Sequence, residues 1–224
     1  MKVRIFLLII SFCFINSILA LGAKIEFSDL PETHWAYEYI YSMVDLGILE
    51  GYPDGTFLPD KEMSRAEFST LLTQSLDADI IRPKEPTFND VLKTHWAYRF
   101  IETSKPFFHG FYDSNNFYPQ DPALREDVAS AIVRVYNLEN TQYDESILNQ
   151  FADSANISVE KRKLVAICIE NEFMLGTDLG FEPKKALTRA EACTVLSRAL
   201  KLNELNITPT LPDKEPEFTI IDVY

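Results

Sequence analysis

The chain has 224 residues, of which 46% are hydrophobic and 12% are aromatic, which is enough apolar material for a buried core in one or two domains. This composition excludes a disordered protein. The formal net charge of −13 argues against nucleic acid and anionic lipid as partners of the folded body.

The N-terminus, residues 1–22, has the pattern of a secretory signal peptide. Two cations precede an apolar run from Ile5 to Ala20, which is too short and wrongly flanked for a membrane span. Small residues at its end predict cleavage after Gly22, with cleavage after Ala20 as the alternative and an uncleaved anchor as the less favoured one. Cleavage removes two positive charges and no acid, which takes the net charge from −13 to −15.

The next clear signal is a turn followed by a capped helix. Pro53-Asp54-Gly55 predicts a tight turn, because proline presets φ, aspartate bonds nearby backbone and glycine accepts positive φ. Ser64-Arg65-Ala66-Glu67 predicts a capping box, in which the serine oxygen accepts from the Glu67 amide and the Glu67 carboxylate accepts from the Ser64 amide. The buried stripe of this helix is expected to contain Phe68, Leu71, Leu72, Ser75 and Leu76.

Helix stability alone does not explain Arg65. The residue lies in the first turn and off the apolar stripe, where a cation opposes the helix dipole by about 0.3–1 kcal/mol. The residues leave two interpretations open. Arg65 is either solvated or paired with a nearby acid, or it belongs to an anion site made of its guanidinium and the free amides of the helix start.

The turn and the helix belong to a unit that occurs three times. Each copy opens with Phe-x-Asp, at Phe27–Asp29, Phe88–Asp90 and Phe151–Asp153. His-Trp-Ala follows at His34–Ala36 and at His95–Ala97, and the third copy lacks it. Each copy then has a first helix, whose buried face includes Ile40, Met43 and Val44 in the first copy and Leu164, Ile167 and Cys168 in the third. We expect Gly47 to end the first of these helices.

The turn and the capping box also return. Gly, an acid and Phe-x-Pro occur in all three turns, which begin at Gly51, Gly110 and Gly176. The capping box recurs as Thr188-Arg189-Ala190-Glu191. The middle copy has Leu124-Arg125-Glu126-Asp127, which keeps the arginine and loses the hydroxyl, so we expect Asp121-Pro122 to begin that helix instead.

We therefore expect an all-α protein in which three helical repeats pack as one body, because a two-helix unit of about 50–60 residues is marginally stable alone. The predicted segments are a signal peptide (1–22), copy 1 (25–78), copy 2 (86–138), copy 3 (149–202) and a proline-rich, acidic tail (203–224) that either folds back or frays. The short joins between copies are expected to pack on the body. Cys168 and Cys193 either form a disulfide or remain buried thiols, and we favour thiols.

Phe-x-Asp, His-Trp-Ala, Gly-Tyr-Pro-Asp-Gly-Thr-Phe-x-Pro-Asp and Ser/Thr-Arg-Ala-Glu, in this order, closely resemble the S-layer homology (SLH) domain of bacterial cell-surface proteins. The resemblance covers residues 25–202. It implies three repeats about a pseudo-threefold axis, with grooves between neighbours. It also implies a secreted, cell-wall or S-layer associated protein of a Gram-positive-type bacterium that binds secondary cell-wall polysaccharide, commonly through a pyruvate-ketal sugar.

The resemblance also names candidate site residues. The motif arginine is a main contributor in the family, so Arg65 with Ser64 and Arg189 with Thr188 are expected to receive the ketal carboxylate. Arg125 matches in part, and copy 2 lacks the Asp-Gly turn, so its groove is expected to be weakened or lost. Further candidates are Gly51, Asp54, Trp35 and Trp96, although a tryptophan at the start of an amphipathic helix is more often core than groove wall. His34 and His95 are expected to be helix-entry residues.

Two other functions stay open at this stage. Carboxylates such as Glu67 and Glu191 would be needed for a wall-glycan hydrolase, but the capping boxes already explain them, so no enzyme is expected. An assembly adaptor would dock another surface protein through the acidic body and the tail. No cofactor is expected, and Asp29, Asp54 and Asp60 lack the spacing of a calcium loop.

Overall fold

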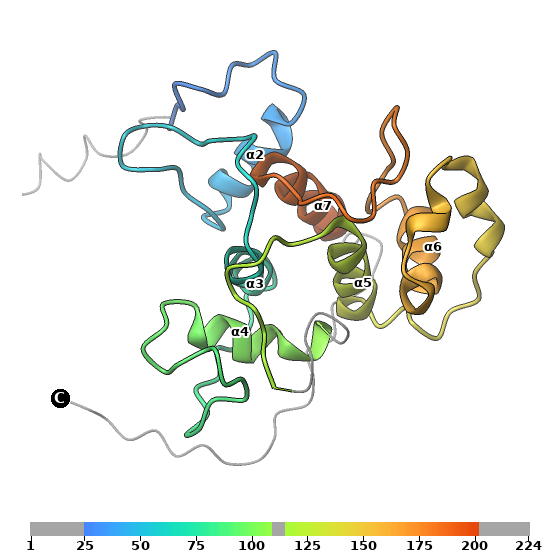
Figure 1. Cartoon of the computed structure of the whole chain (residues 1–224). Coiled ribbons are helices and arrows are strands. Elements are labelled where there is room, and N and C mark those ends of the chain that lie inside the picture. The colour runs from blue at the N-terminus through green and yellow to red at the C-terminus, as the bar shows by residue number, and fades with distance from the viewer. Residues whose placement is uncertain (1–24, 109–114, 202–224) are drawn as a thin grey trace, which may run out of the picture.

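The computed structural model describes residues 25–108 and 115–201 (Figure 1). Within these two ranges the regular elements are α-helices and 3₁₀ helices, joined by isolated β-bridges. The all-α class expected from the sequence is thereby confirmed. The predicted signal peptide, the tail and the start of the copy 2 turn lie outside the described residues. No helix in the described ranges has the length and apolarity needed to cross a membrane.

Each copy supplies two α-helices. Copy 1 supplies α2 (Tyr37–Asp45) and α3 (Arg65–Ser75). Copy 2 supplies α4 (Tyr98–Ser104), the 3₁₀ helix η1 (Lys105–Phe107) and α5 (Arg125–Val135). Copy 3 and the join before it supply η2 (Glu145–Gln150), η3 (Ser154–Asn156), η4 (Val159–Lys161), α6 (Arg162–Glu170) and α7 (Arg189–Lys201).

The apolar stripes predicted from spacing form the core. On α3, Phe68 and Leu72 are fully buried, and the equivalent positions on α5 and α7 are buried as well. The predicted faces of α2 and α6 are also inside. Gly47 ends α2 with a φ of +68°, as expected for a residue that takes the left-handed conformation cheaply. Buried residues of all three copies belong to one core cluster, so the expectation of a single packed body is confirmed.

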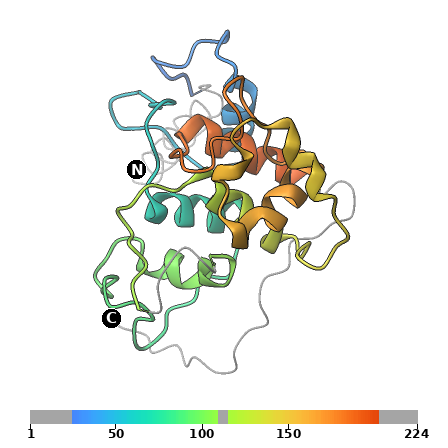
Figure 2. The same cartoon turned by 45° about the vertical axis from the view of Figure 1, so that its right-hand side comes forward.

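The closest helix pairs join different copies. In Figures 1 and 2, α2 of copy 1 packs on α7 of copy 3, α4 of copy 2 packs on α3 of copy 1, and α6 of copy 3 packs on α5 of copy 2. The first helix of every copy therefore packs on the second helix of the preceding copy, with copy 3 preceding copy 1 in the ring. This interlocking explains how units too small to be stable alone share one core.

A closed ring of backbone hydrogen bonds lies where the three copies meet. The Met63 amide donates to the Leu187 carbonyl (2.9 Å), the Leu187 amide to the Ala123 carbonyl (2.8 Å), and the Ala123 amide to the Met63 carbonyl (2.9 Å). These residues stand at equivalent places just before α3, α5 and α7. The ring gives the chain the pseudo-threefold arrangement that the resemblance implies.

An aspartate holds the turn of each copy. Asp29 accepts from the Phe57 and Leu58 amides at 2.7 and 2.8 Å, and Asp90 and Asp153 accept from the equivalent amides of copies 2 and 3. The second amide always belongs to the middle residue of Phe-x-Pro, which has a positive φ of 55–57° in all three copies. Because non-glycine residues rarely take this conformation, the carboxylate stabilises a strained backbone that aims the next segment at its neighbour.

The expected start of the copy 2 helix is wrong. Helix α5 begins at Arg125 with Leu124 as N-cap and no side-chain cap, and it does not begin at Asp121-Pro122. The first two amides of α5 donate instead to carbonyls of copy 3, Arg125 to Lys185 (3.0 Å) and Glu126 to Pro183 (3.1 Å). The third amide, Asp127, which a hydroxyl cap would satisfy, donates to the Leu124 carbonyl (3.0 Å).

Candidate polymer-binding site between the copies

The amides at the helix starts are not free. At α3 the Arg65 amide donates to Asp121 (2.8 Å) and the Ala66 amide to Pro119 (3.0 Å), while Ser64 Oγ caps the Glu67 amide (3.2 Å). The start of α7 is occupied in the same way by Lys61 and Pro59 carbonyls and by Thr188. The expectation that free amides would help to receive an anion is therefore wrong. Both predicted capping boxes are present, so Ser64 and Thr188 act as caps.

The arginine of each copy contacts the turn of the next copy. Arg65 donates to the Phe117 carbonyl (3.1 Å), Arg125 to the Phe181 carbonyl (2.8 Å) and Arg189 to the Phe57 carbonyl (2.9 Å). We call these places junction 1/2, junction 2/3 and junction 3/1, after the copies that supply the arginine and the turn. The two irregular features of copy 2 therefore fall on different junctions, its arginine on 2/3 and its turn on 1/2.

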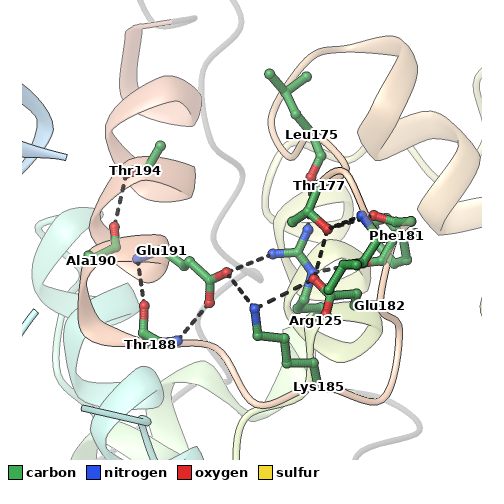
Figure 3. Close-up of polar contacts among 12 residues, drawn as sticks. Arg125, Leu175, Thr177, Phe181, Glu182, Lys185, Thr188, Ala190, Glu191 and Thr194 are labelled. Carbon is green, nitrogen blue, oxygen red and sulfur yellow. Dashed lines mark hydrogen bonds and ion pairs between the residues drawn. The ribbon is translucent and has the colours of Figure 1, made fainter. Parts of the chain in front are cut away.

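At junction 2/3 the arginine is fully engaged by the protein (Figure 3). Arg125 is only 3% exposed. Besides the Phe181 carbonyl, it binds the Leu175 carbonyl through Nη2 (2.8 Å) and the Glu191 carboxylate through Nη1 (3.3 Å). Lys185 Nζ approaches the same carboxylate at 3.5 Å. The carboxylate of Glu191 thus already occupies the place where an acidic ligand would have to bind.

At junction 3/1 the arginine is differently placed. Arg189 is half-buried; its Nε donates to the Phe57 carbonyl and its Nη2 lies 3.4 Å from the Glu50 carbonyl. Its guanidinium carbon lies 4.6 Å from the centre of the Phe57 ring and 5.0 Å from that of Tyr52, at cation–π distance. Among the residues that the structure describes, no carboxylate forms an ion pair with Arg189. The guanidinium is held in position and keeps its charge available.

A cavity of about 410 Å³ lies beside Arg189. Its wall includes Glu50, Glu67, Thr70 and Gln74 of copy 1, and Trp96 of copy 2. All three copies therefore contribute to it, which no local stretch of sequence could indicate. The volume falls within the range of small-molecule sites. The wall combines an indole ring, amide and hydroxyl groups and one guanidinium with two glutamates, Glu50 and Glu67.

The two tryptophans are not core residues. Trp35 and Trp96 are 59% and 56% exposed, so the expectation that they are core residues is wrong. His34 and His95 take the inward place: the Nδ1 of each accepts an amide just before the first helix, at 3.1 Å, which confirms their helix-entry role. Each indole stacks on its histidine and faces outward. Trp96 lines the cavity of junction 3/1, whereas Trp35 does not.

Gly51 and Asp54 shape the turn without lining the cavity. A Cβ on Gly51 would lie 2.2 Å from the Phe27 ring, so only glycine fits there. Asp54 accepts from the amide and the hydroxyl of Thr56 at 3.0 and 2.7 Å, and these bonds lower its pKa. The next residue, Gly55, has a φ of +82°, as the turn pattern predicts.

Glu67 is placed for capping and for pairing with a cation. Burial by itself would raise its pKa, but hydrogen bonds from Lys61 (2.8 Å) and Ser64 (2.8 Å) outweigh burial and hold the pKa below its ordinary value. A general acid needs the opposite shift. In the two described ranges no group of three His, Cys, Asp or Glu residues is arranged to hold a metal ion.

The sequence alone did not predict several residues of junction 3/1. Lys61 donates to the Tyr52 hydroxyl (3.1 Å), and Thr70 and Gln74 reach the cavity from α3. Tyr52 stands inside the turn motif, so its contact with the arginine of another copy had a local signal. Thr70 and Gln74 had none, because a polar residue on the exposed face of a helix predicts only solvent contact.

The described part of the chain is an interlocked ring of tandem helical copies with an arginine at each junction between them. The sequence profile of the S-layer homology domain matches residues 26–69 and 150–193, which lie in copies 1 and 3. The chain is 30% identical over 173 residues to an S-layer protein of Bacillus licheniformis, covering 77% of this chain and 19% of that protein.

Two further relatives extend this likeness. The S-layer protein sap of Bacillus anthracis is 31% identical over 175 residues, which cover 78% of this chain and 21% of that protein. A cellulosome-anchoring protein of Acetivibrio thermocellus is 34% identical over 140 residues, which cover 59% of this chain and 30% of that protein. The chain thus spans about a fifth of the length of the S-layer relatives. These findings identify a cell-surface, cell-wall associated protein, as the sequence predicted.

Proposed function

We propose that the protein anchors non-covalently to the bacterial surface by binding a secondary cell-wall polysaccharide that carries carboxylates, such as a pyruvylated glycan. Junction 3/1 is the principal site. The observation that supports this proposal is Arg189, which is oriented by two carbonyls and two rings, lies beside a cavity of about 410 Å³ and has no ion-pair partner among the described residues.

The chemistry of the cavity suits an acidic sugar. A ketal carboxylate would pair with the guanidinium of Arg189, and charge-assisted hydrogen bonds of this kind are about twice as strong as neutral ones. Trp96 offers an exposed ring on which the apolar face of a sugar can pack. Thr70 and Gln74 offer hydrogen-bond partners for ring hydroxyls.

The proposal includes copy 2 as a third S-layer homology repeat, with the boundaries given above. The family profile does not extend over this copy. Three contacts of copy 2 support its inclusion. Ala123 joins the central ring of hydrogen bonds, Asp90 holds the turn of copy 2, and Arg125 contacts the turn of copy 3, as their counterparts do in copies 1 and 3. Loss of the hydroxyl cap and of the Asp-Gly turn then changes the ligand sites and leaves the packing intact.

The three junctions are unequal in this proposal. Junction 2/3 binds no polymer, because Glu191 already pairs with Arg125. Junction 1/2 is the secondary site. Arg65 lies 6.0 Å from the Tyr118 ring. At this junction the position equivalent to Trp96 belongs to copy 3 and is Val159, which offers no aromatic ring. Only junction 3/1 combines the arginine, the complete Gly-Tyr-Pro-Asp-Gly turn and a tryptophan.

The test is binding of the mature protein to wall fragments with and without the pyruvyl group, measured by calorimetry and by sedimentation with sacculi. Arg189→Gln should weaken binding by about 10- to 100-fold, the value of one charge-assisted pair. Arg65→Gln should weaken it less. The matched control is Arg198→Gln, also on α7, whose guanidinium lies over Tyr39. Wild-type affinity in Arg189→Gln, or equal binding of fragments without pyruvyl groups, would contradict the proposal.

A further inference from the structure

A second set of charges lies at junction 2/3, separate from the Arg125 pair. Glu126 and Asp127 on α5 are each 1% exposed, and Lys161, from copy 3, is 9% exposed. Lys161 Nζ is 3.1 Å from Glu126 Oε1 and also pairs with Asp127. Lys184 Nζ is 2.6 Å from the same Glu126 oxygen. The Ser158 amide and hydroxyl complete the set by donating to the Glu126 carboxylate at 3.0 and 2.8 Å.

The set divides cleanly between two copies. Both acids come from copy 2, and both lysines and the serine come from copy 3. Hydrogen bonds from two lysines and one serine satisfy the Glu126 carboxylate, so its burial is compensated. These residues lie outside the cavity of junction 3/1, so they are independent of the proposed polymer site.

Two positions of the network are uncharged at the other junctions, whereas Asp127 corresponds to Glu67 and Glu191, and Lys184 corresponds to Asp60 in copy 1 and to Gln120 in copy 2. Glu126 corresponds to Ala66 in copy 1 and to Ala190 in copy 3. Lys161 corresponds to Tyr98 in copy 2 and to Tyr37 in copy 1, which stand at the starts of α4 and α2. Glu126 and Lys161 thus occupy positions at which the other two junctions have an alanine and a tyrosine.

This difference affects which first helix can pack against α5. The three second helices have the same phase and the same starting geometry, so each could in principle accept the first helix of any copy. If α5 instead accepted α2 or α4, Glu126 and Asp127 would be buried without Lys161, and a tyrosine would take its position. A buried carboxylate without a partner is strongly unfavourable, whereas a well-paired one is close to neutral.

We propose that the Glu126–Asp127–Lys161–Lys184 network is a pairing code, which makes copy 2 accept only copy 3 of its own chain and so fixes the order of the copies around the ring. The code acts against wrong pairings more than it adds stability to the right one. Wrong pairings include exchange of helices between two molecules, because the same surfaces are presented by every chain.

The test is a triple variant of the full mature chain, Glu126→Ala, Asp127→Ala and Lys161→Tyr, which removes both buried acids together with the lysine that pairs with them. It should fold with a thermal midpoint near that of the wild type, since apolar replacement of a buried ion pair is often neutral. On refolding at increasing protein concentration it should give dimers and larger species by light scattering, while the wild type stays monomeric.

Two further variants test the same proposal independently. Lys161→Tyr alone leaves both acids buried and should lower the folding equilibrium constant by a factor on the order of 100 or more. The converse variant, Ala66→Glu, Tyr98→Lys and Gln120→Lys, repeats the code at junction 1/2 and should also refold to mixed oligomers. Monomeric refolding of either triple variant at every concentration, or wild-type stability of Lys161→Tyr, would overturn the pairing code.

Discussion

The aspartate that holds each turn supports a quantitative prediction. In Asp29→Asn the side chain keeps one oxygen, so it can accept from either the Phe57 or the Leu58 amide but not from both, and its NH₂ group faces the other donor. The wild-type distances to the two amide nitrogens are 2.7 and 2.8 Å, and Phe57 is fully buried. The change therefore removes one charge-assisted bond and weakens the other.

The size of the effect follows from these contacts. Loss of one charge-assisted bond is worth about 1.5–3 kcal/mol, and part of the roughly 1–2 kcal/mol cost of the left-handed Leu58 is no longer offset. We expect the free energy of unfolding to fall by about 2–4 kcal/mol. For a folded body of this size that corresponds to a decrease in the thermal midpoint of about 5–12 °C.

The assay is urea and thermal unfolding followed by circular dichroism at neutral pH. The chain contains its own replicates, because Asp90→Asn and Asp153→Asn change the same geometry in copies 2 and 3 and should cost similar amounts. Asp54→Asn is the matched control: Asp54 also accepts two hydrogen bonds but lies exposed in a turn, and its variant should unfold like the wild type. An equal loss of unfolding free energy in Asp29→Asn and Asp54→Asn would contradict this prediction.

Three more predictions follow from the same contacts. Gly51→Ala should lower the free energy of unfolding by about 1–3 kcal/mol, because its Cβ would overlap the Phe27 ring. Gly47→Ala has open space around it and should lower the free energy of unfolding by no more than roughly 1 kcal/mol, which is the cost of its positive φ; chemical denaturation measures both values. Burial raises the pKa of the two free thiols, Cys168 and Cys193, to about 12, so neither should react with Ellman's reagent at pH 8 until the protein unfolds. The folded-state pKa of Glu67 lies below its ordinary 4.5, so its stabilising effect is present above about pH 4.5 and is lost as the pH falls through the folded value; the acid limb of stability against pH should be shallower in Glu67→Gln.

Differences between the junctions matter more for function than differences between the copies. Copy 2, for example, supplies Arg125 to junction 2/3, its turn to junction 1/2 and Trp96 to junction 3/1. Copy 3 lacks a tryptophan, yet its Arg189 serves the most complete site, because Tyr52 comes from copy 1 and Trp96 from copy 2. Variants should therefore be designed by junction, and a change in one copy is expected to affect up to three places.

Much of the local structure could be predicted from the sequence. The capping box at Ser64, the turn at Gly55 and the left-handed end of α2 at Gly47 were predicted correctly, and so was the buried stripe of α3 except for Leu76, which is partly buried. Each of these features depends on residues within a few positions of one another, where hydrogen-bond reach and helix periodicity leave few choices. The triple occurrence of the unit also predicted one shared core, because a single unit cannot bury enough apolar surface.

The site itself was decided by contacts between residues far apart in the chain. The amides at the start of α3 are taken by carbonyls more than 50 residues away, and Arg189 meets a turn more than 130 residues before it. The sequence marked the arginines as unexplained, but only the tertiary structure assigns Arg125 to an internal carboxylate and leaves Arg189 beside a cavity. The reason is that the two helices of a copy pack on different neighbours, and its arginine contacts the turn of the next copy.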